Sequence, residues 1–366
     1  MFNPKFSITN NILKNIGTIE ACREVIDHAP LLPYYEREFQ KDALVRSVHY
    51  GTHIEGNALN LDQAEKVMEG HEVLARDRDI QEVINYRKVI DYIEVKSSKF
   101  SIRQAQDKKV QSSDGEIEPE ITEDLIKELH KMTVDRILPP EKIGNFRETQ
   151  VVVKNSQTGE VSFRPPDSSE INPQMEELLR FINDKENKDI HPVLKAGIVH
   201  YEFVRIHPFL DGNGRVARAF ATLILFLEGY DIRRFFSLEE YFDSDAPDYY
   251  EALKSVSQNE GDLTNWLEYF TKGLSIELSK IKDKVENISI DAHLKEKLGG
   301  KPMMLTDRQI KIIEYIQKVG YLQNKAFASL FPMVSEDTIL NELKGLQSNG
   351  IIRKTGVTKS ARYVMT

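Results

Sequence analysis

HPFLDGNGRVAR, residues 207–218, is the most informative segment of this chain of 366 residues. Its centre, Gly212-Asn213-Gly214, consists of residue types that tolerate unusual backbone dihedrals, so that successive N–H groups can point at one anion. From Arg215 the chain reads RVARAFATLILFL, an apolar run without Gly or Pro that predicts a helix to Leu227. The glycine-rich turn would then lie at a helix N-terminus, where free N–H groups and the helix dipole favour phosphate.

The side chains of the same segment suit the chemistry of phosphate esters. His207 has an ordinary pKa near neutrality and can take a proton from a hydroxyl group. Asp211 is a hard oxygen ligand of the kind that Mg²⁺ prefers. Arg215 and Arg218, three residues apart on one helix face, can both hold phosphate oxygens. A capping turn with solvated arginines would explain the glycines, but such a turn needs neither the histidine nor the arginine pair.

The segment resembles the signature of the Fic family, HPFxDGNGRxxR, and all nine specified positions are present. Fic proteins are mainly helical enzymes that move AMP from ATP onto a Ser, Thr or Tyr hydroxyl of a target protein. The resemblance implies ATP as co-substrate and Mg²⁺ as cofactor. It also implies these roles: His207 is the base, Asp211 holds Mg²⁺, the Gly212–Gly214 turn binds the phosphates, Arg215 contacts the α- and β-phosphates, and Arg218 contacts the γ-phosphate.

A β-hairpin pattern precedes the signature, with strand-like runs at 149–153 and 160–163 around a polar turn at 155–159. Composition alone favours a small ribbon packed on helices. Its position resembles the Fic flap, which holds the target peptide by pairing with the peptide backbone. In that interpretation residues 144–147 form the approach, and the target protein binds through residues 149–163.

Two residues after the signature resemble those that enclose adenine in Fic proteins. Tyr250 would line the base and Asn259 would donate a hydrogen bond to it. Without the family context, a tyrosine in a helical bundle is more often a core residue.

Upstream, Thr52-His53-Ile54-Glu55-Gly56-Asn57 resembles the inhibitory motif (S/T)xxxE(G/N) of Fic proteins. The resemblance implies that Glu55 pairs with Arg218, which then cannot hold a γ-phosphate. Gly51 stands where the motif has Ser or Thr, and the nearest hydroxyl is that of Thr52, which is expected to touch the nucleotide. An inhibitory segment before the core would make the chain a class II member. The alternative is a solvated glutamate near a helix end that Gly56 and Asn57 terminate.

Composition excludes several other classes of protein. The single cysteine, Cys22, rules out an intramolecular disulfide and a thiolate metal cluster. No run reaches the length of a membrane span, and the N-terminus lacks a basic-then-apolar signal pattern, so we expect a cytoplasmic protein without membrane contact. The net charge is −9, yet residues 301–366 carry ten Lys or Arg against five acids, a net of +5. A basic terminal module is a weak indication of nucleic-acid binding.

The rest of the chain predicts a mainly helical protein. Apolar residues recur at three-to-four spacing in 61–70, 79–95, 121–138 with Thr122 as N-cap, and 192–205; further helices are expected from 237, from 248, and as a pair across 259–288. Residues 96–118 are polar and aperiodic, which predicts a loop. His200 is predicted to be a packed helix residue and not a zinc ligand, because no HExxH pattern surrounds it.

Four divisions follow along the chain: an N-terminal helical region at 1–118, a catalytic core at 119–290, a linker at 291–302 and a further domain at 303–366. The last predicts helices at 307–319, 325–330 and 335–348, then a hairpin at 351–364. This order resembles a winged helix-turn-helix, with Thr338, Asn341 and Lys344 facing outward from the recognition helix. Three acids on that helix, Glu336, Asp337 and Glu342, disfavour DNA, so a DNA partner and a protein partner both remain open.

We therefore expect a mainly α protein: a helical Fic core with a β-hairpin flap, followed by a winged helix-turn-helix domain. The leading function is a protein adenylyltransferase that Glu55 inhibits within its own chain. Two alternatives remain open, removal of AMP from a modified protein and regulation of transcription by a nucleotide-sensing, DNA-binding protein. The target protein and a homo-oligomeric state are not determined by the sequence.

Overall fold

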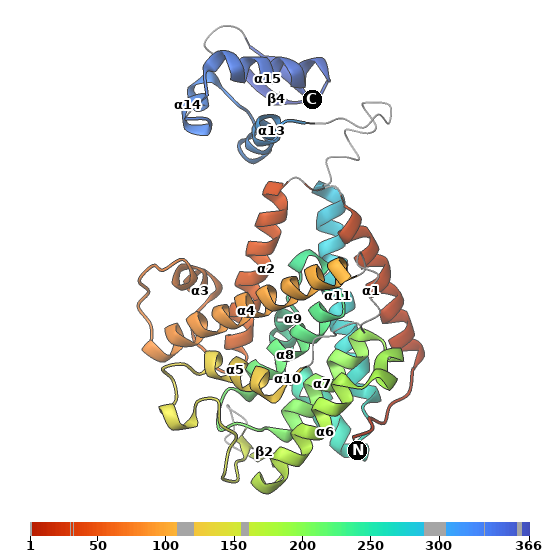
Figure 1. Ribbon diagram of the computed structural model, residues 1–366. Helices are drawn as coiled ribbons and strands as arrows, with labels where there is room; N and C mark the ends of the chain where they lie inside the picture. Colours follow the sequence, from red (N-terminus) through yellow and green to blue (C-terminus); the bar gives the residue numbers. More distant parts are fainter. Residues whose placement is uncertain are drawn as a thin grey trace. The chain divides into compact units, whose positions relative to one another are not determined.

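The computed structural model describes residues 2–29, 31, 33–107, 121–154, 161–288, 305–332, 334–356 and 361–366 (Figure 1). The chain divides into two compact units. One comprises Met1–Asp27 and Phe39–Lys282, and the other comprises His28–Glu38 and Asp283–Thr366. The helices around the signature therefore lie in the same unit as most of the N-terminal residues.

Helices dominate the larger unit. They are α1 (Asn10–His28), α2 (Pro33–His53), α3 (Leu61–Met68), α4 (Asp77–Asp107), α5 (Glu123–Thr133), α6 (Ile171–Asn183), α7 (Pro192–Ile206), α8 (Asn213–Leu227), α9 (Leu238–Ser244), α10 (Ala246–Gln258) and α11 (Thr264–Ile288). Helix α8, the signature helix, lies inside this bundle and packs against α4, α5 and α7 (Figure 1). The predicted helices at 61–70, 79–95, 121–138, 192–205 and 215–227 are confirmed as α3, α4, α5, α7 and α8.

The core forms around α7 and α8 because both helices are apolar on nearly every side. A Cβ on Gly197 of α7 would stand 2.8 Å from Leu267 Cδ2, so the glycine permits α11 to approach closely. Trp266 Nε1 donates to the Gly197 carbonyl over 2.7 Å and satisfies the one polar atom of a fully buried indole. His200 is fully buried on the same helix, as predicted, and its Nε2 lies 2.9 Å from the hydroxyl of Tyr249.

Two predictions about the helices are wrong. Residues 96–107 are not a loop, because α4 continues to Asp107; the rest of that predicted loop lies outside the described residues. No Gly or Pro interrupts this stretch, so the helix that the buried part of α4 initiates can propagate at one hydrogen bond per residue. The predicted helix pair across 259–288 is the single helix α11, preceded by a turn. Gly273 does not break α11, since the Tyr241 ring fills the space beside it.

The hairpin before the signature is present but short. Strand β1 (Val153–Lys154) pairs antiparallel with β2 (Val161–Phe163). The predicted turn at 155–159 lies outside the described residues. Strand β1 follows α5 in the chain and β2 precedes α6, and β2 lies at one end of the bundle (Figure 1).

The smaller unit has its own hydrophobic core. Its elements are α13 (Asp307–Val319), the short helix η5 (Asn324–Ala326), α14 (Phe327–Leu330), α15 (Glu336–Ser348) and the antiparallel strands β3 (Ile352–Thr355) and β4 (Arg362–Met365). This is the order that the sequence predicts. Thr306 caps α13 with a capping box, and Ser335 caps α15. Asn341 and Lys344 are exposed, whereas Thr338 is half-buried.

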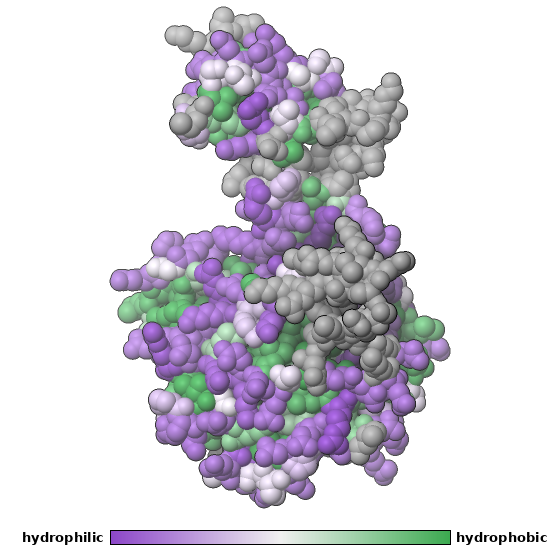
Figure 2. Space-filling model, in the orientation of Figure 1, coloured by the Kyte–Doolittle hydropathy of each residue, from purple (hydrophilic) through white to green (hydrophobic). Residues whose placement is uncertain are grey.

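Hydrophilic residues predominate on the face of each unit that Figure 2 shows, and apolar residues form smaller areas among the hydrophilic ones. Among the helices that the structure describes, none offers an apolar stretch long enough to cross a bilayer.

Candidate active site

His207 sits in a strained turn between α7 and α8. It ends α7 with φ 50° and ψ 60°, in the left-handed region that a non-glycine residue seldom adopts. Arg147 holds this turn from the segment that leads to the hairpin: its Nε donates to the His207 carbonyl and its backbone N–H to the Pro208 carbonyl, each over 2.8 Å. Strain of this kind persists only where neighbouring contacts enforce it, and it concentrates at functional sites.

The imidazole of His207 is arranged to accept a proton. Its Nδ1–H donates to the Val204 carbonyl at 3.3 Å, which leaves Nε2 with its lone pair. Burial lowers the pKa of His207, so the ring is neutral at neutral pH. A neutral imidazole with a free Nε2 is the form that a general base requires.

Asn213, which the sequence assigns to phosphate binding, closes the turn. Its side-chain oxygen accepts the Phe209 N–H at 2.9 Å, and its side-chain nitrogen donates to the Phe209 carbonyl at 2.8 Å. The side chain is buried, so only the backbone N–H of Asn213 can serve an anion. Gly212 caps α8 with φ 78° and without a side-chain hydrogen bond. The first-turn N–H groups of α8 are therefore left for a ligand.

The Glu55 carboxylate occupies this helix terminus. A Cβ on Gly214 would overlap Glu55 Oε1, so the glycine at 214 is what lets the carboxylate approach α8. Glu55 Oε1 also accepts a hydrogen bond of 2.9 Å from Arg218 Nη2. Burial alone would lower the pKa of Arg218, but the Glu55 carboxylate together with the nearby Tyr249 and Tyr86 raises it overall. The acid and the second signature arginine are thus paired, as the inhibitory motif implies.

The surroundings of Gly51 explain why a Ser or Thr, which the motif has at this position, is absent. The Gly51 carbonyl accepts a second hydrogen bond of 2.8 Å from Arg218 Nη2. A side chain at this position would overlap the ring of Tyr86, which is fully buried and donates to Glu239 over 3.1 Å. Thr52 does not replace the missing hydroxyl, because its buried Oγ1 donates to two carbonyls of its own helix, each at 3.0 Å. The Gly51 carbonyl therefore takes over the contact with Arg218, and the Tyr86 ring occupies the space of the motif's side chain.

Asp211 and Arg215 meet at the opposite side of the turn. Asp211 Oδ1 accepts from the Gly212 N–H at 2.6 Å and from Arg215 Nη2 at 3.3 Å. Burial raises the pKa of Asp211, but Arg215 and the hydrogen bonds from Arg78 and Gly212 outweigh that effect and lower it. Within the described residues, no group of three or more His, Cys, Asp or Glu could hold a metal. A single carboxylate still fits Mg²⁺, which in nucleotide sites takes one or two carboxylates and completes its shell with phosphates and water.

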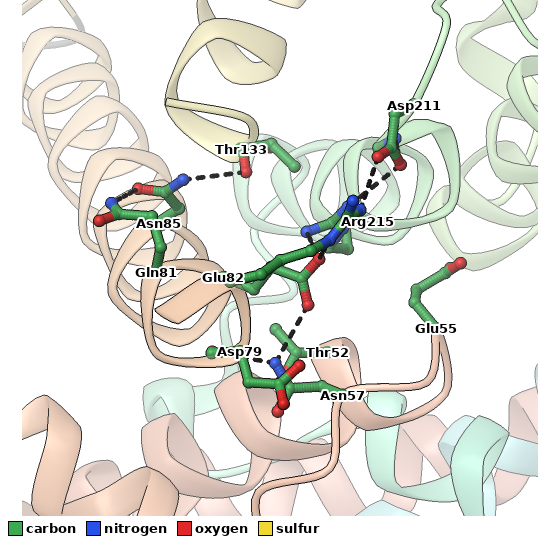
Figure 3. A network of polar contacts seen from close by, with 12 residues as sticks. Thr52, Glu55, Asn57, Asp79, Gln81, Glu82, Asn85, Thr133, Asp211 and Arg215 are labelled. Atoms are coloured by element: carbon green, nitrogen blue, oxygen red, sulfur yellow. Dashed lines mark hydrogen bonds and ion pairs between the residues drawn. The ribbon is translucent and has the colours of Figure 1, made fainter. Parts of the chain in front are cut away.

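Two residues from α4 that the sequence did not single out complete this side. Arg78 Nη2 donates to Asp211 Oδ2 at 2.7 Å, and Glu82 Oε1 lies 3.3 Å from Arg215 Nη1. Figure 3 shows Glu82 between Arg215 and Asn57, whose side-chain nitrogen donates to Glu82 Oε2 at 3.1 Å. The only sequence signal was the four-residue spacing of Glu82 from Arg78, which stands just before the helix predicted at 79–95, and this spacing is equally typical of a solvated pair.

His130 of α5 is a further residue that sequence reasoning missed. Its ring stacks on Phe209 with the centroids 3.7 Å apart, Nε2–H donates to the Asp211 carbonyl at 3.2 Å, and Nδ1 accepts the Gly144 N–H at 2.9 Å. Burial lowers the pKa of His130 to about 4, which keeps the ring neutral. One imidazole thus joins the signature turn to the approach of the hairpin.

The predicted adenine contacts lie on α10. Tyr250 is exposed, and its hydroxyl stands 3.5 Å from the Ile54 carbonyl, next to Glu55 in the chain. Asn259 ends α10 and lines an open cleft with Lys5 and Asp262. The structure therefore brings Tyr250 to the Glu55 turn, and it places Asn259 next to the N-terminal segment.

Known proteins match this chain in sequence. Residues 120–225 match the Fic/DOC family. The protein adenylyltransferase Fic of Drosophila grimshawi is 29% identical over 194 residues, 53% of this chain and 35% of the relative. That of Nematostella vectensis is 27% identical over 234 residues, 63% of this chain and 47% of the relative. The chain therefore spans less than half of the length of these curated relatives.

Solved structures share the fold. A Fic family protein from Desulfovibrio desulfuricans has a TM-score of 0.65 at 24% identity, covering 100% of this chain and 98% of that chain. A fragment of Fic-1 from C. elegans has a TM-score of 0.59 at 23% identity, covering 75% of this chain and 73% of that chain. The mainly helical fold with a hairpin before the signature, expected from the sequence, is thereby confirmed.

Proposed function

We propose that this chain, which carries a Fic domain, transfers AMP from ATP to a hydroxyl group of a target protein. The observation that supports the proposal most directly is the convergence at the start of α8. His207 Nε2 is left as an acceptor, and the Glu55 carboxylate bonds Arg218 and lies against Gly214 in the first turn of α8. A terminus that binds a carboxylate in this way can bind a phosphate by the same groups.

The chemistry assigns one task to each group. The hydroxyl oxygen of the target attacks the α-phosphorus, its proton passes to His207 Nε2, and the bond to the pyrophosphate oxygen breaks. Arg215 and the first-turn N–H groups of α8 neutralise the charge that develops on the phosphate oxygens. Asp211 would hold Mg²⁺, which supplies further positive charge between the phosphates when it is bound. The hairpin at 149–163 would hold the target segment by its backbone.

Glu55 inhibits the transfer in this proposal. Arg218 Nη2 bonds the Glu55 carboxylate, and the same carboxylate lies against Gly214 where the phosphates would approach α8. ATP could not place its γ-phosphate on Arg218 while that pair persists. The pair lies within one chain, so the inhibition needs no partner.

The test uses full-length protein, Mg²⁺ and ATP labelled at the α-phosphorus. We expect Glu55→Gly to incorporate label into itself or an added lysate about tenfold faster than wild type or more. The Glu55→Gly/His207→Ala double variant should incorporate none. Glu72→Gly, which removes an exposed glutamate from the loop before α4, is the matched control and should behave as wild type. Equal labelling by wild type and Glu55→Gly would contradict the inhibitory role of Glu55. Labelling by the double variant would contradict the assignment of His207 as the base.

A second candidate is the removal of AMP from a modified protein. It is supported by the exposure of Glu55, whose side chain is 33% accessible and could align a water molecule beside the phosphate site. His207 would then protonate the leaving hydroxyl oxygen. In this case a pre-labelled target should release AMP with wild type and not with Glu55→Gly, the reverse of the result expected above.

A third candidate concerns the smaller unit. Arg353, Lys354 and Arg362 of its hairpin are exposed, as a wing that contacts DNA phosphates requires. Duplex DNA binding by the full chain that weakens steeply with salt would support a regulator of transcription. Salt-independent capture of a protein would instead assign this unit to docking.

A further inference from the structure

Four side chains form a closed ring of alternating charge beside the signature turn. Arg78 Nε donates to Glu82 Oε1 at 3.0 Å, and Arg78 Nη2 donates to Asp211 Oδ2 at 2.7 Å. Arg215 Nη2 donates to Asp211 Oδ1, and Arg215 Nη1 lies beside Glu82 Oε1, both at 3.3 Å. Each carboxylate thus faces two guanidinium groups, and each guanidinium faces two carboxylates.

The two halves of the ring differ in burial. The side chains of Arg215 and Glu82 are 3% and 7% exposed, whereas those of Asp211 and Arg78 are 31% and 55% exposed. Glu82 is also fixed by Asn57, whose side-chain nitrogen donates to Glu82 Oε2 (Figure 3). A buried pair is costly to break because it leaves an uncompensated charge, while an exposed pair exchanges readily. The buried Glu82–Arg215 contact therefore resists opening, whereas the exposed Arg78–Asp211 contact opens more readily.

Arg78 occupies the oxygen of Asp211 that a metal would need. Asp211 Oδ1 is already taken by the Gly212 N–H and by Arg215, so Oδ2 is the oxygen with a single, exposed partner. A guanidinium 2.7 Å from Oδ2 and a Mg²⁺ on the same oxygen would be two neighbouring cations, which repel each other. When Arg78 leaves Oδ2, its Nε can stay on Glu82.

We propose that Arg78 is the resident counter-ion of Asp211 and that the divalent cation must displace it, while Glu82 retains Arg78 nearby and keeps Arg215 in position. The inference rests on the proposed function, in which Asp211 holds Mg²⁺ together with ATP. Arg78 then reduces the factor by which Mg²⁺ raises the affinity for ATP. It neutralises Asp211 when ATP arrives without metal, and it competes with the metal when both are present.

The test compares ATP binding by calorimetry with Mg²⁺ and with EDTA, on the full chain. The ratio of the two affinities measures the coupling. Arg78→Gln replaces the guanidinium with a shorter, neutral polar side chain, and we expect it to raise the ratio about fivefold. Arg76→Gln is the matched control, since Arg76 lies two residues away, is equally exposed and pairs with Asp79 instead of Asp211. It should leave the ratio unchanged.

The outcomes separate the inference from the proposed function. If Arg78→Gln leaves the ratio of the two ATP affinities unchanged, while Asp211→Asn abolishes the effect of Mg²⁺ on ATP binding, the inference about Arg78 is overturned. The proposed metal site at Asp211 would then stand. An equal loss of affinity with and without Mg²⁺ would also overturn the inference, because Arg78 would then be a phosphate ligand. A full effect of Mg²⁺ in Asp211→Asn would overturn the proposed metal site itself, and no ATP binding by any variant would overturn the proposed function.

Discussion

At the scale of single residues, Arg218 binds two acceptors from the N-terminal part of the chain. Its buried guanidinium is shared between the Glu55 carboxylate and the Gly51 carbonyl, one from a side chain and one from the backbone of α2. The carbonyl is available because no side chain at 51 intervenes, and Tyr86 takes the vacated space. Gly51 therefore packs against Tyr86 without overlap, and the absence of a side chain there does not weaken the hydrogen bonds of Arg218.

The Gly51→Ala variant tests that fit. Its Cβ would overlap Tyr86, which is fully buried and cannot move aside, so we expect a loss of about 1–3 kcal/mol in the free energy of unfolding. Gly17→Ala is the control: this exposed helical glycine has nothing within 4 Å of a Cβ, and the change should stabilise by about 0.5–1 kcal/mol. Urea unfolding measures both. A Gly51→Ala protein as stable as wild type would show that Tyr86 does not pack as described.

At the scale of elements, α4, α5 and α8 meet at the signature turn. Helix α8 contributes the arginines and the free N–H groups, α4 contributes Arg78 and Glu82, and α5 contributes His130. The site is therefore held by three helices of the larger unit as well as by the turn that the signature encodes. Rigid elements of this kind position catalytic groups better than loops do.

His130→Ala tests the contribution of α5. The change removes a ring stacked on Phe209 and leaves the buried Gly144 N–H and the Asp211 carbonyl without their partner, so we expect a loss of about 2–4 kcal/mol in the free energy of unfolding. His71→Ala, at an exposed histidine, should change it by less than about 0.5 kcal/mol. Denaturant curves of the three proteins give the comparison. Equal free energies of unfolding for all three proteins would show that His130 does not stabilise the fold.

At the scale of the whole molecule, two hydrophobic cores predict two unfolding events. The smaller unit buries its own cluster, which includes Ile316, Phe327 and Leu343. The single tryptophan, Trp266, is fully buried in the larger unit. Its fluorescence therefore reports on the larger unit, whereas circular dichroism reports on the helices of both units.

Leu343→Ala separates the two events. Removing this fully buried side chain should destabilise the smaller unit by about 2–5 kcal/mol and lower its transition in circular dichroism. The unfolding midpoint from Trp266 fluorescence should stay at the wild-type value. A shift of the fluorescence midpoint together with the dichroism would show that the units unfold as one.

The local sequence was enough for those parts of the protein that depend on neighbours in the chain. The helix predicted from Arg215, the caps at Thr122 and Ser335, and the element order of the smaller unit follow from periodicity, capping residues and glycine positions within a few turns of each other. The two helical errors have the same origin. Residues 96–107 lack a period but extend a helix begun earlier, and the closing helix pair is one helix in which a ring covers Gly273.

The site also contains contacts that no local pattern could indicate. Arg78 reaches Asp211 across 133 positions, Gly51 reaches Arg218 across 167, and His130 reaches Asp211 across 81. Such pairs depend on which helix faces meet when the core closes, and exposed and buried charges look alike in the sequence. The histidine, the aspartate and the two arginines of the candidate site stand within twelve consecutive residues, but the contacts of Asp211 with Arg78 and of Arg218 with Glu55 arise from packing, because burial brings together and fixes charges that would otherwise remain in water.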